Sequence, residues 1–189
     1  MDNQETILAN AIQLFASRGY DAVGIQEIAV RSGITKPTLY YYFGSKKGLL
    51  EAILTQFGAR LFQVLREATV FQGDLSASLE AIAAGYFQFA QANPMFYRMQ
   101  LAMYFAPPDS EPNQMIRPLN EFQHRLIEDL FRRAVGNSPG LQGDPQGNAA
   151  TLMGTINTYI GFALNGYLEL NQALVHRVAD QFLHGIWRS

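Results

Sequence analysis

The sequence has no cysteine, one tryptophan and three histidines among its 189 residues. Without cysteine it offers no disulfide, no thiolate nucleophile and no cysteine-ligated zinc site. It also has no apolar run close to the ~20 residues that a membrane-spanning helix needs. The acidic residues Asp2 and Glu5 differ from the basic start of a secretory signal. We therefore expect a cytoplasmic protein that makes no use of a membrane.

Charge is low, and it is unevenly distributed. The net charge is -2, with 14 Lys and Arg against 16 Asp and Glu. Residues 31–47, however, contain the four cations Arg31, Lys36, Lys46 and Lys47 and no acid. A local basic segment on an otherwise acidic protein is typical of a small surface that binds a polyanion.

The pattern of apolar residues predicts an all-α protein. Apolar residues return at helical spacing through most of the chain, and we find no convincing strand and no internal repeat. Asp2 and Glu5 resemble a capping box, and Pro37, Ser45 and Pro94 stand at expected helix starts. The first expected helix ends at residue 18. The others cover residues 25–31, 35–43, 45–65, 75–92, 94–105, 117–135, 148–169 and 172–187, and Gly- and Pro-rich loops are expected at 106–112 and 136–148.

Residues 25–43 have the spacing of a helix-turn-helix unit, with Gly33 where the turn needs a residue that tolerates positive φ. On the second helix, Leu39, Tyr42 and Phe43 share a face that can enter the core, whereas Tyr40 and Tyr41 share the other, so the triple tyrosine divides into one packing member and two outward members. A tyrosine hydroxyl can bond to a phosphate while the ring packs on a sugar or a thymine methyl. We therefore interpret the two outward tyrosines as facing DNA. The alternative is an ordinary surface helix with aromatic packing.

Two lysines at the start of the fourth helix support the same hypothesis. Lys46 and Lys47 are expected in its first turn, where they oppose the helix macrodipole and an acid would be favoured by ~0.3–1 kcal/mol. A nearby anion would reverse that cost. We propose a DNA phosphate as this anion.

Three segments resemble the TetR family of bacterial transcriptional regulators: FASRGYDA, IAVRSGITKPTLYYYF and GSKKGLL. The resemblance covers about residues 5–55, and the rest of the chain agrees in length and helical character only. It implies a homodimer whose paired three-helix heads occupy successive major grooves, usually as a repressor until a small molecule binds the larger helical domain. The domains would be 1–46 for DNA binding and 47–189 for ligand binding and dimerisation. The expected DNA-contacting residues are Thr35, Lys36, Pro37, Thr38, Tyr40, Tyr41, Lys46 and Lys47.

Two positions depart from the family's pattern. Val23 and Gly24 stand where the family often has a threonine that caps the second helix, and Lys47 stands where an acid is common. The resemblance therefore implies that phosphate contacts shift toward Lys46 and Lys47. Half-sites should be about one helical turn apart, ~34–36 Å, or a multiple of it. The fourth helix would transmit movement of the body to the heads.

Aromatic residues and methionines concentrate between residues 86 and 105. Met95, Met99 and Met103 recur at intervals of four residues, and such surfaces adapt to varied apolar ligands. A plain core stripe is the alternative. The candidate residues for binding a small apolar or aromatic effector are Tyr86, Phe89, Met99, Met103 and Phe122.

The last two expected helices are apolar around much of their circumference, and Gly154, Gly161 and Gly166 would let backbones approach. So broad an apolar surface on a terminal hairpin suggests a four-helix seam with a second copy. An internal core is the alternative. The candidate dimer residues are Leu152, Ile156, Tyr159, Ala163, Leu174, Val178 and Phe182.

The sequence holds no convincing catalytic or metal site. The serine of GNSPG, residues 136–140, lies in a Gly- and Pro-rich loop, whereas a nucleophile elbow needs a strand before it and a helix after it. His176, Asp180 and His184 would spread over about 12 Å of helix, too far for all three to hold one ion. We therefore expect no enzyme, no metal and no cofactor. Two other hypotheses stay open: a DNA-binding regulator controlled by a protein partner, and a helical ligand-binding or enzymatic protein that does not bind DNA.

Overall fold

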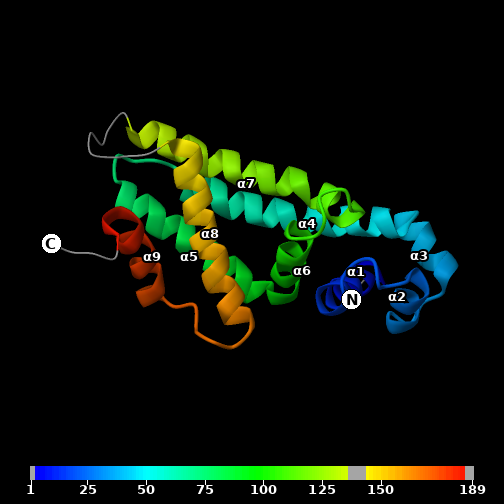
Figure 1. The fold of residues 1–189 in the computed structure, drawn as a ribbon. Coiled ribbons are helices and arrows are strands. Elements are labelled where there is room, and N and C mark those ends of the chain that lie inside the picture. Colours follow the sequence, from blue (N-terminus) through cyan, green and yellow to red (C-terminus); the bar gives the residue numbers. More distant parts are fainter. Residues whose placement is uncertain (1–2, 136–143, 186–189) are drawn as a thin grey trace. The chain divides into compact units, whose positions relative to one another are not determined.

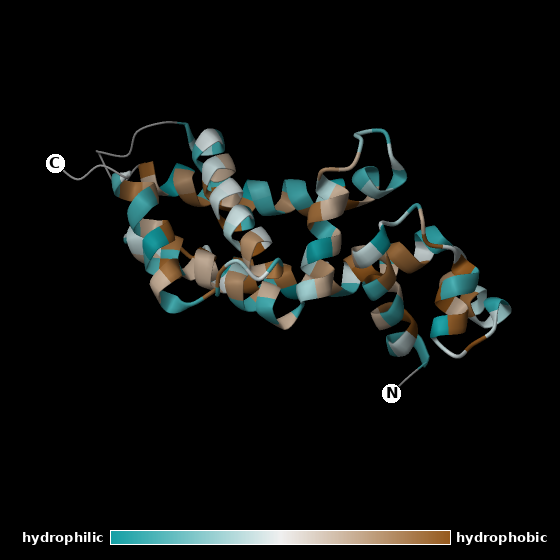
Figure 2. Cartoon of the chain, turned by 60° about the horizontal axis from the view of Figure 1, so that its bottom comes forward, coloured by the Kyte–Doolittle hydropathy of each residue, from teal (hydrophilic) through white to brown (hydrophobic). Residues whose placement is uncertain are grey.

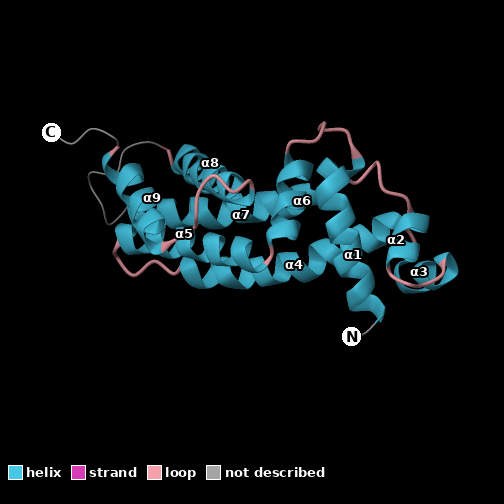
Figure 3. Cartoon of the chain, turned by 90° about the horizontal axis from the view of Figure 1, so that it is seen from below, coloured by secondary structure: helices cyan, strands magenta, loops and turns pink. Residues whose placement is uncertain are grey.

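The computed structural model describes residues 3–135 and 144–185. Every secondary-structure element in these two ranges is a helix (Figure 3), which confirms the all-α prediction. None of these described helices is both long enough and apolar enough to cross a bilayer. The helices are α1 (Asn3–Arg18), α2 (Ile25–Arg31), α3 (Lys36–Phe43), α4 (Lys46–Ala68), α5 (Leu75–Ala92), α6 (Pro94–Tyr104), α7 (Glu111–Val135), α8 (Pro145–Leu164) and α9 (Gln172–His184).

The chain divides into two compact units. The first contains residues 1–60 and 93–119, and so includes α1, α2, α3, α6, the first part of α4 and the start of α7. The second contains residues 61–92 and 120–189, and so includes α5, α8, α9 and the remainder of α4 and α7. The boundary predicted after residue 46 separates a DNA-binding part from a ligand-binding and dimerisation part. It concerns function and not packing, and it stays a prediction.

The three N-terminal helices α1, α2 and α3, which we call the head, form a helix-turn-helix arrangement (Figure 1). Ile7 and Phe15 of α1, Ile28 of α2 and Leu39 of α3 are buried, and hydrophobic and hydrophilic residues alternate along these helices (Figure 2). The turn between α2 and α3 contains Gly33 with a φ of 68°. Glycine adopts this left-handed conformation without strain, as the sequence predicted.

The other helices of the first unit enlarge its core. α6 packs against α1, and Phe96 of α6 stacks on Phe57 of α4 with ring centroids 4.8 Å apart. Asn113 Nδ2 lies 3.0 Å from the carbonyl oxygen of Tyr104 and 3.1 Å from that of Ala106. These hydrogen bonds fix the first turns of α7 to the end of α6.

In the second unit, α5 packs against both α8 and α9. A Cβ on Gly85 of α5 would lie 2.8 Å from Val64 Cγ1 of α4, so glycine permits the close approach of these two helices. At the end of α4, the carbonyl oxygen of Thr69 accepts a hydrogen bond of 3.1 Å from Arg133 Nη2 of α7. Packing and polar bonds together therefore hold α4, α5 and α7 in this unit.

The expected start of α7 at residue 117 was wrong, because the helix begins at Glu111. Pro112 was interpreted as part of a loop. It occupies the second position of the helix, however, where the missing N–H costs no intrahelical hydrogen bond. Glu111 thereby lies in the first turn of the helix, where a carboxylate interacts favourably with the helix dipole.

The expected range 148–169 for the eighth helix was also wrong. α8 begins at Pro145 after the N-cap Asp144, whose Oδ1 accepts a backbone N–H at 2.9 Å, and it ends at Leu164. The proline and glycine there belong to a capped first turn and not to the preceding loop. Asp2, the GNSPG segment and the expected end of the last helix at 187 lie outside the described residues.

Candidate nucleic-acid interface

The N-terminus of α3 is capped and exposed. Thr35 is the N-cap, its Oγ1 accepts from the Thr38 backbone N at 3.4 Å, and the two hydroxyl oxygens are 2.8 Å apart. Pro37 lies in the first turn, which contains no acidic residue. Thr35, Lys36 and Pro37 are all exposed. A helix N-terminus of this kind presents backbone N–H groups and positive potential to an anion.

Tyr40 and Tyr41 lie on the outer face of α3. Tyr41 is 86% exposed and Tyr40 is 41% exposed, whereas Leu39 and Phe43 of the same helix are buried. Tyr42 is half-buried, with its ring centroid 5.5 Å from that of Tyr41. The predicted division of the triple tyrosine into one packing member and two outward members is therefore confirmed.

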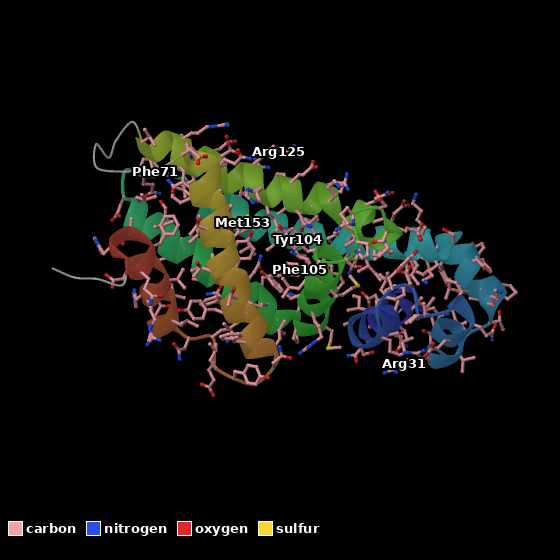
Figure 4. All side chains as sticks on the ribbon, viewed as in Figure 1. Arg31, Phe71, Tyr104, Phe105, Arg125 and Met153 are labelled. Carbon is pink, nitrogen blue, oxygen red and sulfur yellow. The ribbon has the colours of Figure 1, made fainter. Side chains whose placement is uncertain are left out.

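Positive charge lies beside Tyr40 and at the end of α2. Lys36 Nζ lies 5.7 Å from the ring centroid of Tyr40, and Arg31 is exposed at the end of α2 (Figure 4). Asn10 of α1 donates to the Arg31 carbonyl oxygen at 3.3 Å and lies 3.2 Å from Ser32 Oγ. The turn that precedes α3 is thus held against α1, which fixes the direction of the exposed face.

Lys46 makes a contact that the sequence did not predict. Its Nζ lies 4.1 Å from the ring centroid of Tyr20, and the lysine is half-buried. Burial lowers the pKa of Lys46, while the carboxylates of Asp21 and Glu111 oppose that shift. Sequence reasoning missed Tyr20 and Glu111 because no local pattern relates residues so far apart in the chain to Lys46.

Lys47 is exposed and lines an open groove of about 650 Å³ between α4 and the start of α7. Three acids, Glu51, Asp109 and Glu111, line the same groove. Their negative potential partly offsets the charge of Lys47. Lys47 is therefore less favourably placed for a phosphate than the residues of α3.

Residues 7–53 match the family described as bacterial regulatory proteins of the tetR family. The Staphylococcus aureus (strain Newman) biofilm operon icaADBC HTH-type negative transcriptional regulator IcaR is 30% identical over 132 residues. That match covers 68% of this chain and 69% of IcaR. The chain belongs to the TetR family.

Two further proteins resemble this chain, one in sequence and one in fold. The HTH-type transcriptional activator FasR of Mycolicibacterium smegmatis is 36% identical over 93 residues, which are 49% of this chain and only 42% of FasR. The fatty acid degradation regulator FadR from Bacillus halodurans has a TM-score of 0.82 at 19% identity, covering 100% of this chain and 98% of FadR. This second likeness shows the fold alone. The chain thus belongs to a family of DNA-binding transcriptional regulators, and its relatives include both an activator and a negative regulator.

The five residues predicted to bind an effector in this TetR-family chain belong to different units. Met99 and Met103 are buried in the first unit, and Tyr86, Phe89 and Phe122 belong to the second. Each set is therefore described by itself, and a single effector site made of all five stays a prediction.

In the second unit, Tyr86 forms a buried polar pair with Gln123. Tyr86 is buried, and its hydroxyl donates to Gln123 Oε1 at 2.9 Å. Burial raises the pKa of Tyr86 above its ordinary value, so the hydroxyl remains a donor at neutral pH. Phe122 is half-buried and stacks on Phe62 with centroids 4.2 Å apart. A hydroxyl and an amide among aromatic rings can orient the polar end of an otherwise apolar molecule.

Most of the predicted dimer residues are already buried within their own chain. These are Leu152, Ile156, Leu174 and Val178. Tyr159, Ala163 and Phe182 are half-buried, and the Tyr159 hydroxyl donates to Gln181 Oε1 at 3.2 Å. The apolar stripe that suggested a seam therefore packs largely inside the second unit, and a partner could reach only the last three residues. The TetR-family dimer seam stays a prediction.

The histidine pattern of α9 has a simpler explanation in the structure. His176 Nδ1 lies 3.0 Å from Glu80 Oε2 of α5, which joins two packed helices of the second unit. Within residues 3–135 and 144–185, no three His, Cys, Asp or Glu side chains are grouped as a metal ion requires.

Proposed function

We propose that the chain is a repressor that binds a palindromic operator as a homodimer and releases it when a small apolar or aromatic effector binds. The outward placement of Tyr40 and Tyr41 beside the exposed N-terminus of α3 carries the proposal. Exposing two large aromatic rings to water has no benefit for the fold. Both rings contribute to DNA binding, however, when α3 lies in a major groove and their hydroxyls reach phosphates or base edges.

The proposed contacts have separate tasks. Thr35, Thr38 and the free N–H groups of the first turn bind backbone phosphate and set the register of α3. Lys36 adds charge beside Tyr40, with a separation of 5.7 Å that leaves the ammonium free to meet a phosphate. Tyr40 and Tyr41 contact the DNA most deeply. Lys46 contacts a phosphate from the start of α4, whereas Lys47 contributes mainly long-range attraction.

Selection from a random-sequence duplex pool tests DNA recognition and can be carried out before the operator is identified. We expect recovered sequences to be palindromic, with half-site centres about 34–36 Å apart or a multiple of that distance. A pool that shows no enrichment in repeated rounds at low salt would contradict the proposal and favour a helical protein that does not bind DNA.

The proposed homodimer uses the outer face of α8. Gly154, Thr158 and Phe162 are exposed there, and a Cβ built on Gly154 meets nothing within 4 Å. Glycine and threonine permit a second helix to approach closely, and Phe162 supplies apolar area. Residues Tyr159, Ala163 and Phe182 would border this face.

Phe162→Asp is therefore expected to raise the dimer dissociation constant at least tenfold, because a carboxylate would be buried without a partner. Analytical ultracentrifugation over a range of concentrations measures the change. Gln88→Asp, on the exposed face of α5, serves as the control and should leave dimerisation unaltered. Equal dissociation constants for wild type and Phe162→Asp would place the seam elsewhere.

The effector proposal is tested by thermal denaturation with a panel of straight-chain fatty acids and aromatic acids. FadR, which shares the fold, is a regulator of fatty acid degradation, and this is why acyl chains are included. A binder present at 100 times its Kd should stabilise the folded state by about 2.7 kcal/mol, and Tyr86→Phe should reduce that gain. A panel without any stabilising member would favour control by a protein partner.

A further inference from the structure

Three segments of the first unit meet at the side chain of Tyr20. Tyr20 follows α1 and is buried, with its ring centroid 5.2 Å from that of Phe15. Lys46 Nζ, from the first turn of α4, lies 4.1 Å from the centroid of the same ring. The Tyr20 hydroxyl donates to Glu111 Oε2, in the first turn of α7, at 2.8 Å. One phenol side chain therefore joins segments that lie far apart in the sequence.

The ammonium of Lys46 is held with donors to spare. An ammonium carries three N–H donors, and an aromatic face attracts it from one side only. The Ser45 side chain caps the start of α4 by accepting the Gly48 backbone N–H at 2.9 Å. The Lys46 side chain takes no part in this hydrogen bond. Burial lowers the pKa of Lys46, and the carboxylates of Asp21 and Glu111 offset this only in part, so the charged form is incompletely solvated in this position. A DNA phosphate on the open side would supply the missing solvation.

The hydroxyl of Tyr20 fixes the ring under Lys46. Burial first, and then the hydrogen bond to Glu111, raise the pKa of Tyr20 above its ordinary value, so the hydroxyl stays protonated and donates. Glu111 is in turn joined to the end of α6, because Asn113 in the same region of α7 bonds to the Tyr104 carbonyl oxygen at 3.0 Å. A displacement of the first turn of α7 would therefore move the ring on which Lys46 rests.

We propose that Tyr20 is a positioning residue for DNA binding, whose ring holds Lys46 against a backbone phosphate and whose hydroxyl connects that position to Glu111. The inference rests on the proposed phosphate contact of Lys46. It adds a route by which α7 acts on the head: loss of the Tyr20–Glu111 hydrogen bond weakens DNA binding through Lys46 without touching α3.

A double-mutant cycle with Tyr20→Leu and Lys46→Met tests this coupling on the full-length chain, with the duplex recovered by selection as the probe. Lys46→Met should reduce the slope of log K against log salt by about 1.8, because each head loses one phosphate contact worth ~0.9. Tyr20→Leu should reduce the slope equally. In the double variant, the added Lys46→Met change should weaken binding by less than about a further twofold. Ile7→Val, at a buried residue of α1, is the control for a merely destabilised head and should leave the slope intact.

The outcomes separate the two proposals. If Lys46→Met leaves the slope unchanged, Lys46 contacts no phosphate, and both its assignment and the role of Tyr20 are overturned. If Lys46→Met lowers the slope but its effect adds in full to that of Tyr20→Leu, Lys46 keeps its DNA contact and the positioning role of Tyr20 is overturned.

A second cycle isolates the hydroxyl. Tyr20→Phe keeps the ring under Lys46 and removes only the donor to Glu111. We therefore expect DNA affinity to fall about two- to fivefold, which is about the effect of one net hydrogen bond for the two heads together. Glu111→Ala should match it, and the double variant should bind no more weakly than either single variant. Full additivity of these two changes, or a loss with Tyr20→Phe as large as with Tyr20→Leu, would overturn the link between α7 and Lys46.

Discussion

Replacing both Tyr40 and Tyr41 with alanine is expected to weaken binding of the selected operator about a thousandfold. Each side chain should contribute about 1 kcal/mol through a hydrogen bond to DNA, and the dimer carries four such side chains, giving about 4 kcal/mol in all. Fluorescence anisotropy at fixed salt concentration measures the change. The folded state should keep its stability, because Tyr41 is 86% exposed and Leu39 and Phe43 still fill the core.

Tyr104→Ala provides the matched control for this experiment. Tyr104 is also an exposed tyrosine at a helix end, but it belongs to α6 and not to the head. We expect its replacement to change operator affinity less than twofold, within the ordinary range for a surface residue. Similar losses from the Tyr104 and Tyr40/Tyr41 variants would mean that α3 does not carry DNA recognition.

Gly48→Ala should have the largest effect on stability. Gly48 lies in the first turn of α4, and a Cβ there would collide with the backbone carbonyl oxygen of Phe43, the last residue of α3. Alanine is better than glycine in a helix by about 1 kcal/mol, yet a clash with backbone cannot be relieved by rotating a side chain. We expect a net loss of about 2–4 kcal/mol, seen as a lower midpoint in urea denaturation. Operator binding should fall with it.

Gly58→Ala, in the same helix, is the control. Its Cβ would lie 3.3 Å from Leu119 Cδ1, the end of a side chain that can move. The gain in helix propensity and the small shift of Leu119 should nearly cancel, leaving a change below about 1 kcal/mol. Comparable destabilisation by both substitutions would show that the junction between α3 and α4 is not specially constrained.

Those features of the fold that depend on neighbouring residues could be predicted from the sequence. Thr35 and Pro37 define the start of α3, Gly33 defines the turn before it, and the spacing of Leu39 and Phe43 defines its buried face. Pro112 misled the prediction of α7, because the same residue ends a helix in its interior and is well tolerated in its first turn. Only the preceding backbone conformation distinguishes the two cases.

The candidate site was predictable where exposure follows from helical phase and unpredictable where it depends on tertiary contacts. Tyr40 and Tyr41 are exposed because they share the face opposite Leu39. The position of Lys46 depends on Tyr20 and Glu111, which approach it only when α1, α4 and α7 pack together. The apolar stripes of α8 and α9 could not separate self-burial from burial against a partner, since such a stripe serves either purpose, and the seam stays a prediction.

The Tyr20 contacts also bear on regulation. The proposed effector must change the DNA affinity of the head, and affinity changes only if the ligand favours one arrangement over another. Glu111 and Asn113 place the first turns of α7 in contact with both Tyr20 and the end of α6. A shift in this part of the first unit would thus reach Lys46 through two hydrogen bonds and one ring contact.

Photocrosslinking most directly tests the claim that the outward face of α3 binds DNA. p-Benzoylphenylalanine at position 41 should crosslink to the selected duplex, with the adducts mapped to a major groove in each half-site, while the same group at position 104 should give none. Adducts from position 104 with none from position 41 would contradict the assignment of α3 as the DNA-reading helix.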